Sequence, residues 1–340
     1  GRDAGQSNSS GSNNVAVGHF ALEENTTASN NTALGYEALK ENTTGQYNVA
    51  VGSEALKTNT TSRDNTAVGY AALRSNTGPY NTAVGFNSLG NNTTAQQNTG
   101  LGYATLSVNT TGQYNVAIGS TALDANTTAS NNTGVGYAAL GANTTGIRNT
   151  AAGANALDAN TTGDNNTGFG KNALSSNTTA DNNTAVGKDS LKVNTTGEYN
   201  VAVGANALDA NTTATNNTAV GYNSLTANTT AGSNTAVGSA ALGANTTGDH
   251  NTGLGSFALD ANTTAAFNTA VGSNALSANT TGTQNTAVGA YTLDVSNGNY
   301  LTAIGVNALS DNTSGGNNTA VGVQALYRNT TANNNTAIGF

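Results

Sequence analysis

The sequence predicts an all-β fold, a parallel β-solenoid (β-roll) of about 20 coils with a 17-residue repeat, and three observations favour it. A glycine that closes an N-T-A-V-G segment recurs every 17 residues through Gly18, Gly35 and Gly52 to Gly339, with only two intervals shortened to 16. A leucine follows each of these glycines from Gly18 to Gly322 by four residues, from Leu22 to Leu326. Every repeat also clusters Asn, Thr and Gly, which disfavour the interior of a helix.

Each repeat position has an expected role when the repeat is numbered from its first asparagine, as N-T-A-V-G-x-x-A-L-x-x-N-T-T-x-x-x. Positions 2 to 4 predict a short strand with Thr and Val on one face and Ala on the other. The glycine at position 5 predicts a bend, and A-L at positions 8 and 9 a second short strand or edge. N-T-T predicts a turn whose side chains satisfy backbone groups. Stacked coils would then form Leu, Val and Asn ladders.

Position 3 is restricted to small residues, such as Ala16, Gly100 and Gly134. It is next to the valine of position 4 in the predicted strand, so the two side chains point to opposite faces of that strand. Strict smallness indicates close approach to another backbone. We expect this backbone to belong to a second chain, with a second layer of the same chain as the alternative.

The two shortened repeats each lose one residue from the turn that follows the leucine. One turn reads Asn76-Thr77-Gly78-Pro79 and contains the only proline, and the other, Ser296-Asn297-Gly298, contains the only Asn-Gly pair. Tight turns favour these residues. Shortening a turn while both flanking segments are kept is what stacked coils allow.

The repeat runs through residues 1–340 without a linker or insertion, which predicts a single continuous array. The first and last residues fall in mid-repeat, so we interpret the chain as a segment of a longer one.

Without cysteine there is no disulfide framework or thiolate zinc site. The net charge of −8 disfavours nucleic-acid binding, and no apolar run reaches the length of a membrane-spanning helix.

We expect no catalytic, cofactor or metal site. The two histidines, His19 and His250, lie 231 residues apart at different repeat positions and are interpreted as exposed variable residues. The pairs Gly170-Lys171 and Gly187-Lys188 lack the spacing of a phosphate-binding loop.

Position 10 carries two charge patterns. Asp124 and Asp158 lie two coils apart, near the upper limit for an inverting glycosidase pair, and Asp209, Asp260 and Asp294 continue the column. We interpret these aspartates as a solvated face. Nearer residue 1, the column holds Lys40, Lys57 and Arg74, with Glu37, Glu41 and Glu54 beside them, which predicts a mixed-charge patch with a structural role.

Candidate N-glycosylation sites are turn asparagines that begin an N-x-[ST] sequence. The alternative is that Asn and Thr serve as turn and ladder residues. The candidate sites are Asn25, Asn42, Asn59, Asn109, Asn126, Asn143, Asn160, Asn177, Asn194, Asn211, Asn228, Asn245, Asn262, Asn279, Asn312 and Asn329.

The segments N-V-A-V-G (residues 14–18), N-V-A-I-G (115–119) and N-T-A-I-G (335–339) resemble the N-S-V-A-I-G-type repeat of trimeric autotransporter adhesin heads. Longer stretches of the pattern N-T-A-V-G-Y-x-A-L-x-x-N-T-T-G are similar to arrays in phage and bacterial tail-fibre-like proteins. The resemblance implies a left-handed parallel β-roll, three chains around an axis and a bacterial surface. The chain departs from the family in its longer repeat and in having no neck, stalk or membrane anchor motif.

The sequence therefore predicts a non-enzymatic structural rod or fibre segment, the head or shaft of a surface adhesin or a filament. We expect it to be extracellular, on a cell surface or on a virion. Expected partners are further copies of the chain, as a homotrimer or filament, and a host-surface or glycan ligand. Alternatives are an ice-binding solenoid, given the recurrent Thr pairs, and a tail fibre that binds or degrades polysaccharide.

Overall fold

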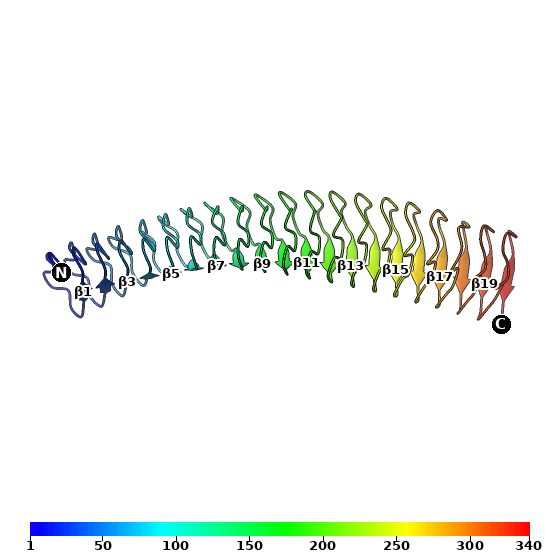
Figure 1. Cartoon of the computed structure of the whole chain (residues 1–340), viewed down its shortest axis with the longest axis horizontal. Coiled ribbons are helices and arrows are strands. Elements are labelled where there is room, and N and C mark those ends of the chain that lie inside the picture. The colour runs from blue at the N-terminus through cyan, green and yellow to red at the C-terminus, as the bar shows by residue number, and fades with distance from the viewer. The chain divides into compact units, whose positions relative to one another are not determined.

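The computed structural model describes residues 1–340 and confirms the all-β parallel β-solenoid, with 20 three-residue strands and no helix (Figure 1). The chain divides into two compact units, unit 1 (Gly1–Asn166) and unit 2 (Thr167–Phe340), and each is described by itself. A single continuous array over residues 1–340 stays a prediction.

The strands are the T-A-V segments that the repeat predicts. Unit 1 contains β1 (Val15–Val17), β2 (Thr32–Leu34), β3 (Val49–Val51), β4 (Thr66–Val68), β5 (Thr82–Val84), β6 (Thr99–Leu101), β7 (Val116–Ile118), β8 (Thr133–Val135) and β9 (Thr150–Ala152). Unit 2 contains β10 (Thr167–Phe169), β11 (Thr184–Val186), β12 (Val201–Val203), β13 (Thr218–Val220), β14 (Thr235–Val237), β15 (Thr252–Leu254), β16 (Thr269–Val271), β17 (Thr286–Val288), β18 (Thr302–Ile304), β19 (Thr319–Val321) and β20 (Thr336–Ile338).

Within each unit the strands pair in parallel, with every residue beside its equivalent in the next coil. In unit 1, Ala33 of β2 lies beside Ala50 of β3, and in unit 2, Ala202 of β12 lies beside Ala219 of β13. The register also holds across both shortened coils, where β4 pairs with β5 and β17 with β18. The prediction that each short coil loses a residue only from its turn is therefore confirmed.

The two faces of the strand are as predicted. The alanine at position 3 is fully buried, as at Ala50 and Ala219, whereas the residues at positions 2 and 4 point outward and are partly exposed. The chain's own coil fills the space beside position 3. At Gly134, an added Cβ would lie 3.0 Å from the carbonyl oxygen of Ala139 and 3.4 Å from Cγ of Leu123 in the preceding coil. The expectation that position 3 meets another chain is therefore wrong.

The A-L segment is a pair of tight turns, and the prediction of a second strand there is wrong. Glu37 and Leu39, at positions 7 and 9, have φ of 55° and 50°. A strand would send adjacent side chains to opposite faces, but Ala38 and Leu39 are both fully buried. The left-handed backbone at the leucine turns both side chains into the interior, where the leucines form the apolar core.

The glycine at position 5 is required by both conformation and space. Gly35 has φ of 142°, and an added Cβ would lie 2.6 Å from the carbonyl carbon of Gly52 in the next coil. Any side chain here would push neighbouring coils apart, which explains why glycine recurs at this position in every repeat.

Two buried asparagine columns complete the interior. In the turn column, at position 12, Nδ2 of Asn42 donates to Oδ1 of Asn25 in the preceding coil (3.2 Å) and to the carbonyl of Gly45 in its own coil (3.0 Å). In the strand column, at position 1, Oδ1 of Asn31 accepts from the backbone nitrogen of Asn48, and Nδ2 of Asn31 donates to Gly45 (2.8 Å). These asparagines thus bond both within their coil and to a neighbouring coil, which satisfies groups that could not be buried otherwise; Oδ1 of Asn59 and Nδ2 of Asn234 are the column atoms buried without a partner.

Candidate functional site

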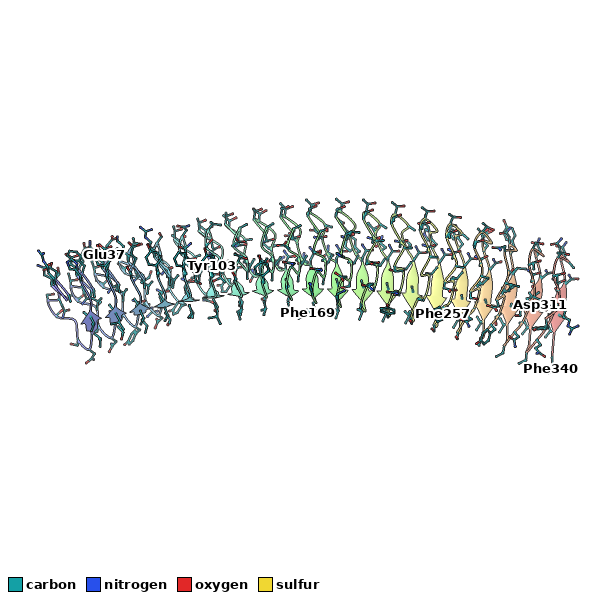
Figure 2. All side chains as sticks on the ribbon, in the orientation of Figure 1. Glu37, Tyr103, Phe169, Phe257, Asp311 and Phe340 are labelled. Atoms are coloured by element: carbon teal, nitrogen blue, oxygen red, sulfur yellow. The ribbon has the colours of Figure 1, made fainter.

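The surface best suited to a partner is the outer sheet face, which we define as the side chains at positions 2 and 4 of the strands. Apolar side chains stand half-exposed along it in both units, from Leu34 (45%) and Leu101 (45%) in unit 1 to Phe169 (44%) and Ile304 (41%) in unit 2. Phe169 projects from the outer side of β10 (Figure 2). Contiguous exposed apolar surface of this kind marks an interaction site in a soluble protein.

The outer sheet face carries no charge. Its residues are Thr or Val at position 2 and Val, Leu, Ile, Ala or Phe at position 4. Each unit repeats this pattern strand after strand in strict register. The face therefore offers a partner a periodic surface of small hydroxyl and branched aliphatic groups.

An aromatic ladder lies at position 6 in unit 1, two residues beyond the strand. The rings of Tyr70, Phe86 and Tyr103 stack on consecutive coils, with centroids 5.3 Å apart and planes within 15°. Each residue remains about half-exposed. Stacking of this kind stabilises neighbouring coils and leaves part of each ring open to a ligand.

The mixed-charge patch predicted near residue 1 is confirmed. Glu37 pairs with Lys40 in its own coil and with Lys57 in the next, and Glu54 pairs with Arg74 at 3.1 Å. The hydrogen bond from Lys57 holds the pKa of the Glu37 carboxyl below its ordinary value, against the effect of burial. These pairs join successive coils, in keeping with the structural role we predicted.

The aspartates at position 10 are partly buried. Burial raises the pKa of Asp124, as does the charge of Asp158, and burial also raises the pKa of Asp158. In unit 2, Asp260 behaves in the same way, and its Oδ1 is enclosed without a hydrogen-bond partner. Three or more His, Cys, Asp or Glu side chains never gather closely enough to hold a metal ion, and no pocket forms at the surface of residues 1–340.

The histidines lie in different units. His19, in unit 1, stacks on Phe20 at 3.7 Å, and His250, in unit 2, is exposed and stacks on Phe267 at 5.0 Å. His19 is only partly exposed and its Nε2 is enclosed, so the description of both residues as exposed holds for His250 alone. The lysines beside the repeat glycines follow strands, and Lys188 pairs with Asp189.

The candidate glycosylation asparagines form the turn column described above. All of them except Asn329 are fully buried. At Asn126, for example, Nδ2 donates to Oδ1 of Asn109 and to the carbonyl of Ala129. A glycan at this nitrogen would replace one of its two N–H donors, so at least one bond would be lost, and it would not fit the interior, so the folded chain is a poor acceptor. Glycosylation before folding stays a prediction, which the mass of the native chain tests.

The threonine pairs of the N-T-T turn do not share one role. At Thr43 and Thr110, Oγ1 donates to the carbonyl of the equivalent threonine in the next coil. The threonine that follows, such as Thr44 or Thr111, is exposed. Ice binding, the alternative based on these pairs, stays a prediction that a thermal-hysteresis assay tests.

Two features of the site escaped sequence reasoning. The consensus leaves position 15 open, although Ala28, Gly45 and Ser62 are all small and their carbonyl groups accept bonds from the asparagine columns. The space is tight here, since a Cβ added to Gly45 would meet the carbonyl oxygen of Ser62 in the next coil. The sequence also does not show which face of the strand is exposed, and the structure places the aliphatic residue of position 4 on the outer sheet face. The restriction of position 15 to Ala, Gly and Ser is visible in the sequence and could have revealed the first feature.

No protein-family model matches this chain, and no curated protein is similar enough to it to indicate a family. The chain forms strands and turns, and it contains no helix that is long and apolar enough to cross a membrane. What can be stated of its class is therefore the fold, a parallel β-solenoid with a 17-residue repeat.

Proposed function

We propose that this chain is a structural segment of an extracellular fibre or surface adhesin, without catalytic activity, in which further copies of the same chain cover the outer sheet face. The observation that carries the proposal is the uncharged apolar column of position 4, which is partly exposed to half-exposed in both units. Leaving that column in water costs free energy that association would recover.

A second copy is the occupant that fits best because the surface is periodic. Each strand presents the same two side-chain positions as its neighbour, one coil apart. A partner can match this spacing along many coils only if its own surface has the same repeat. The resemblance to trimeric autotransporter heads supports three copies per assembly and a location on a bacterial surface.

The further partner that we propose is a glycan or another host-surface ligand at the aromatic ladder of unit 1. The half-exposed rings of Tyr70, Phe86 and Tyr103 offer apolar surface to the C–H faces of sugars. A loss of glycan binding in Phe86→Ala, with no loss in Phe257→Ala on unit 2, would support this assignment. Equal binding by both variants would refute it.

The test of self-association is the mass of the chain in solution, by light scattering or sedimentation. A variant with Val135→Asp, Val186→Asp and Val237→Asp places charge on the outer sheet face, at residues 37%, 37% and 38% exposed. The matched control carries Val108→Asp, Val193→Asp and Val295→Asp, at residues 38%, 36% and 43% exposed but outside that face. We expect the native chain and the control to assemble and the face variant to be a monomer. A monomeric native chain would refute the proposal.

A further inference from the structure

The second shortened coil contains a chemically distinct turn in unit 2. Asn297 is the only asparagine in the sequence that is followed directly by glycine. Its side chain is exposed, whereas the asparagines of the two columns are buried and followed by Thr or Val. Glycine has no side chain to shield its backbone nitrogen from an attack on the preceding side chain.

The hydrogen bonds around Asn297 concentrate donors on its amide oxygen. Oδ1 accepts from the backbone nitrogen of Thr280 (2.8 Å), from Oγ1 of Thr280 (3.0 Å) and from the backbone nitrogen of Thr281 (3.2 Å). Donors placed in this way polarise a carbonyl group and stabilise the negative charge that develops when a nucleophile adds to its carbon. An ordinary exposed asparagine has water in their place.

The neighbouring nitrogen also has a specific partner. The backbone N–H of Gly298 donates to Oγ of Ser296 at 3.2 Å. Ser296 occupies the position that asparagine holds in the other coils after the first, so this hydroxyl is specific to the shortened coil. This hydrogen bond orients the Gly298 N–H, and hydroxide from the alkaline solvent removes its proton as the nitrogen becomes a nucleophile.

We propose that Asn297–Gly298 is a self-modification site, at which the fold promotes conversion of Asn297 through a succinimide. The backbone nitrogen of Gly298 bonds to Cγ of Asn297 and the bond from Cγ to Nδ2 breaks. The Gly298 proton leaves with Nδ2 as ammonia. Water then adds to either imide carbonyl and opens the ring, giving aspartate or iso-aspartate. Water is the only co-reactant, and nothing is oxidised or reduced.

The product would alter the coil that contains it. Iso-aspartate adds one methylene group to the backbone of a turn that is packed against coils on both sides, where the nitrogen of Asn297 donates to the carbonyl of Thr313. We expect the modified turn to lose amide protection locally while distant coils keep theirs.

The experiment incubates the whole folded chain at mildly alkaline pH and follows Asn297 by peptide mapping that separates aspartate from iso-aspartate. A synthetic peptide of residues 290–305 gives the rate without the fold. We expect Asn297 to convert faster in the folded chain than in the peptide, while the Asn76–Thr77 turn of the other short coil stays intact. An intact Asn297 in the folded chain, with conversion in the peptide, would overturn the proposal.

A pair of variants tests the assisting donors. Thr280→Val removes one donor to Oδ1 and is expected to slow conversion about fivefold, the factor that one ordinary hydrogen bond represents. Thr263→Val makes the same change one coil earlier, where Oγ1 donates to the carbonyl of Thr280 and not to Asn297, and should leave the rate unchanged. Equal rates in both variants and the native chain would overturn the assisted mechanism.

Discussion

The two shortened coils, one in each unit, accommodate the same deletion in different ways. The coil of unit 1 keeps both asparagines, and Oδ1 of Asn76 accepts from Asn81 at 3.1 Å and from Asn92 at 2.7 Å. The short turn of unit 2 has lost both of the asparagines that flank it, because Ser296 stands at position 12 of the short coil and Leu301 at position 1 of the next coil, while Asn285 keeps position 1 of the short coil. The comparison shows that a coil can lose a residue without losing register, and that its interior can be either a polar network or a smaller, more apolar one.

The two short coils should differ most in the free energy of unfolding that is lost when the turn-column residue, Asn76 or Ser296, is replaced by alanine. Asn76→Ala should have the larger effect. Asn76 also donates from Nδ2 to the carbonyl of Gly78 at 2.7 Å, so the change removes three buried hydrogen bonds. We expect a loss of about 3 kcal/mol in the free energy of unfolding. Denaturant titration of the whole chain measures it, with Thr44→Ala, an exposed turn residue, as a control that changes little.

Ser296→Ala should cost less, about 1 kcal/mol. Oγ of Ser296 accepts from Asn312 and Gly298, but Nδ2 of Asn312 keeps its second bond to the carbonyl of Gly315. The same titration, combined with hydrogen exchange of the two turns, checks the ranking. If Ser296→Ala proved as damaging as Asn76→Ala, the contrast between the two interiors would fail.

The charged residues beside each short coil should affect the free energy of unfolding less than the buried hydrogen bonds do. In unit 1, Arg74 of the short coil pairs with Glu54, whereas in unit 2 Asp294 of the short coil lies two coils along the sequence from Asp260, which has the same charge. Burial, followed by the charge of Asp294, raises the pKa of Asp260. A raised carboxyl pKa stabilises the fold below the unfolded value and loses that stabilisation as pH rises through the folded value.

Asp260→Asn should therefore stabilise the chain at neutral pH by less than about 1 kcal/mol. The gain should disappear as pH falls below the ordinary aspartate value of 3.8. Denaturant midpoints of variant and native chain, measured across this range, check the sign. A gain that grew in acid would contradict the assignment.

The smallest change is expected from Leu301→Asn, which would restore the strand column. The new side chain can donate to the carbonyl of Gly315 and accept from the nitrogen of Asn318, by analogy with Asn31, Gly45 and Asn48. These two bonds are worth about 2 kcal/mol, and the lost leucine burial costs about as much. We expect the free energy of unfolding to change by less than about 1 kcal/mol, and a collapse of the fold would show that leucine is required there.

Much of this fold was predictable because the 17-residue repeat is visible in the sequence. The strand at T-A-V, its two faces, the glycine bend and the shortened turns all follow from side-chain period and turn chemistry. The turn at Ala38–Leu39 was not predictable from propensity, because leucine rarely adopts the left-handed conformation and only packing can enforce it.

The candidate site was predicted less well than the fold. Val and Leu at position 4 resemble core residues in sequence, and nothing local shows that the leucine of position 9 and two asparagines already fill the interior. The asparagines were identified as turn and ladder residues, and those at position 12 also as candidate glycosylation sites. Their burial distinguishes these two interpretations for the folded chain, and it depends on contacts between coils that a single repeat does not contain.

The most direct test of the account is hydrogen exchange of the asparagine side-chain amides, followed by NMR on a chain labelled at asparagine. The amides of the buried columns, such as those of Asn42 and Asn211, should exchange only when their coils open, whereas those of the exposed Asn297 and Asn334 should exchange freely. If the column amides exchanged as fast as the exposed ones, the coils would not be joined through their asparagines, and this description of the interior would be wrong.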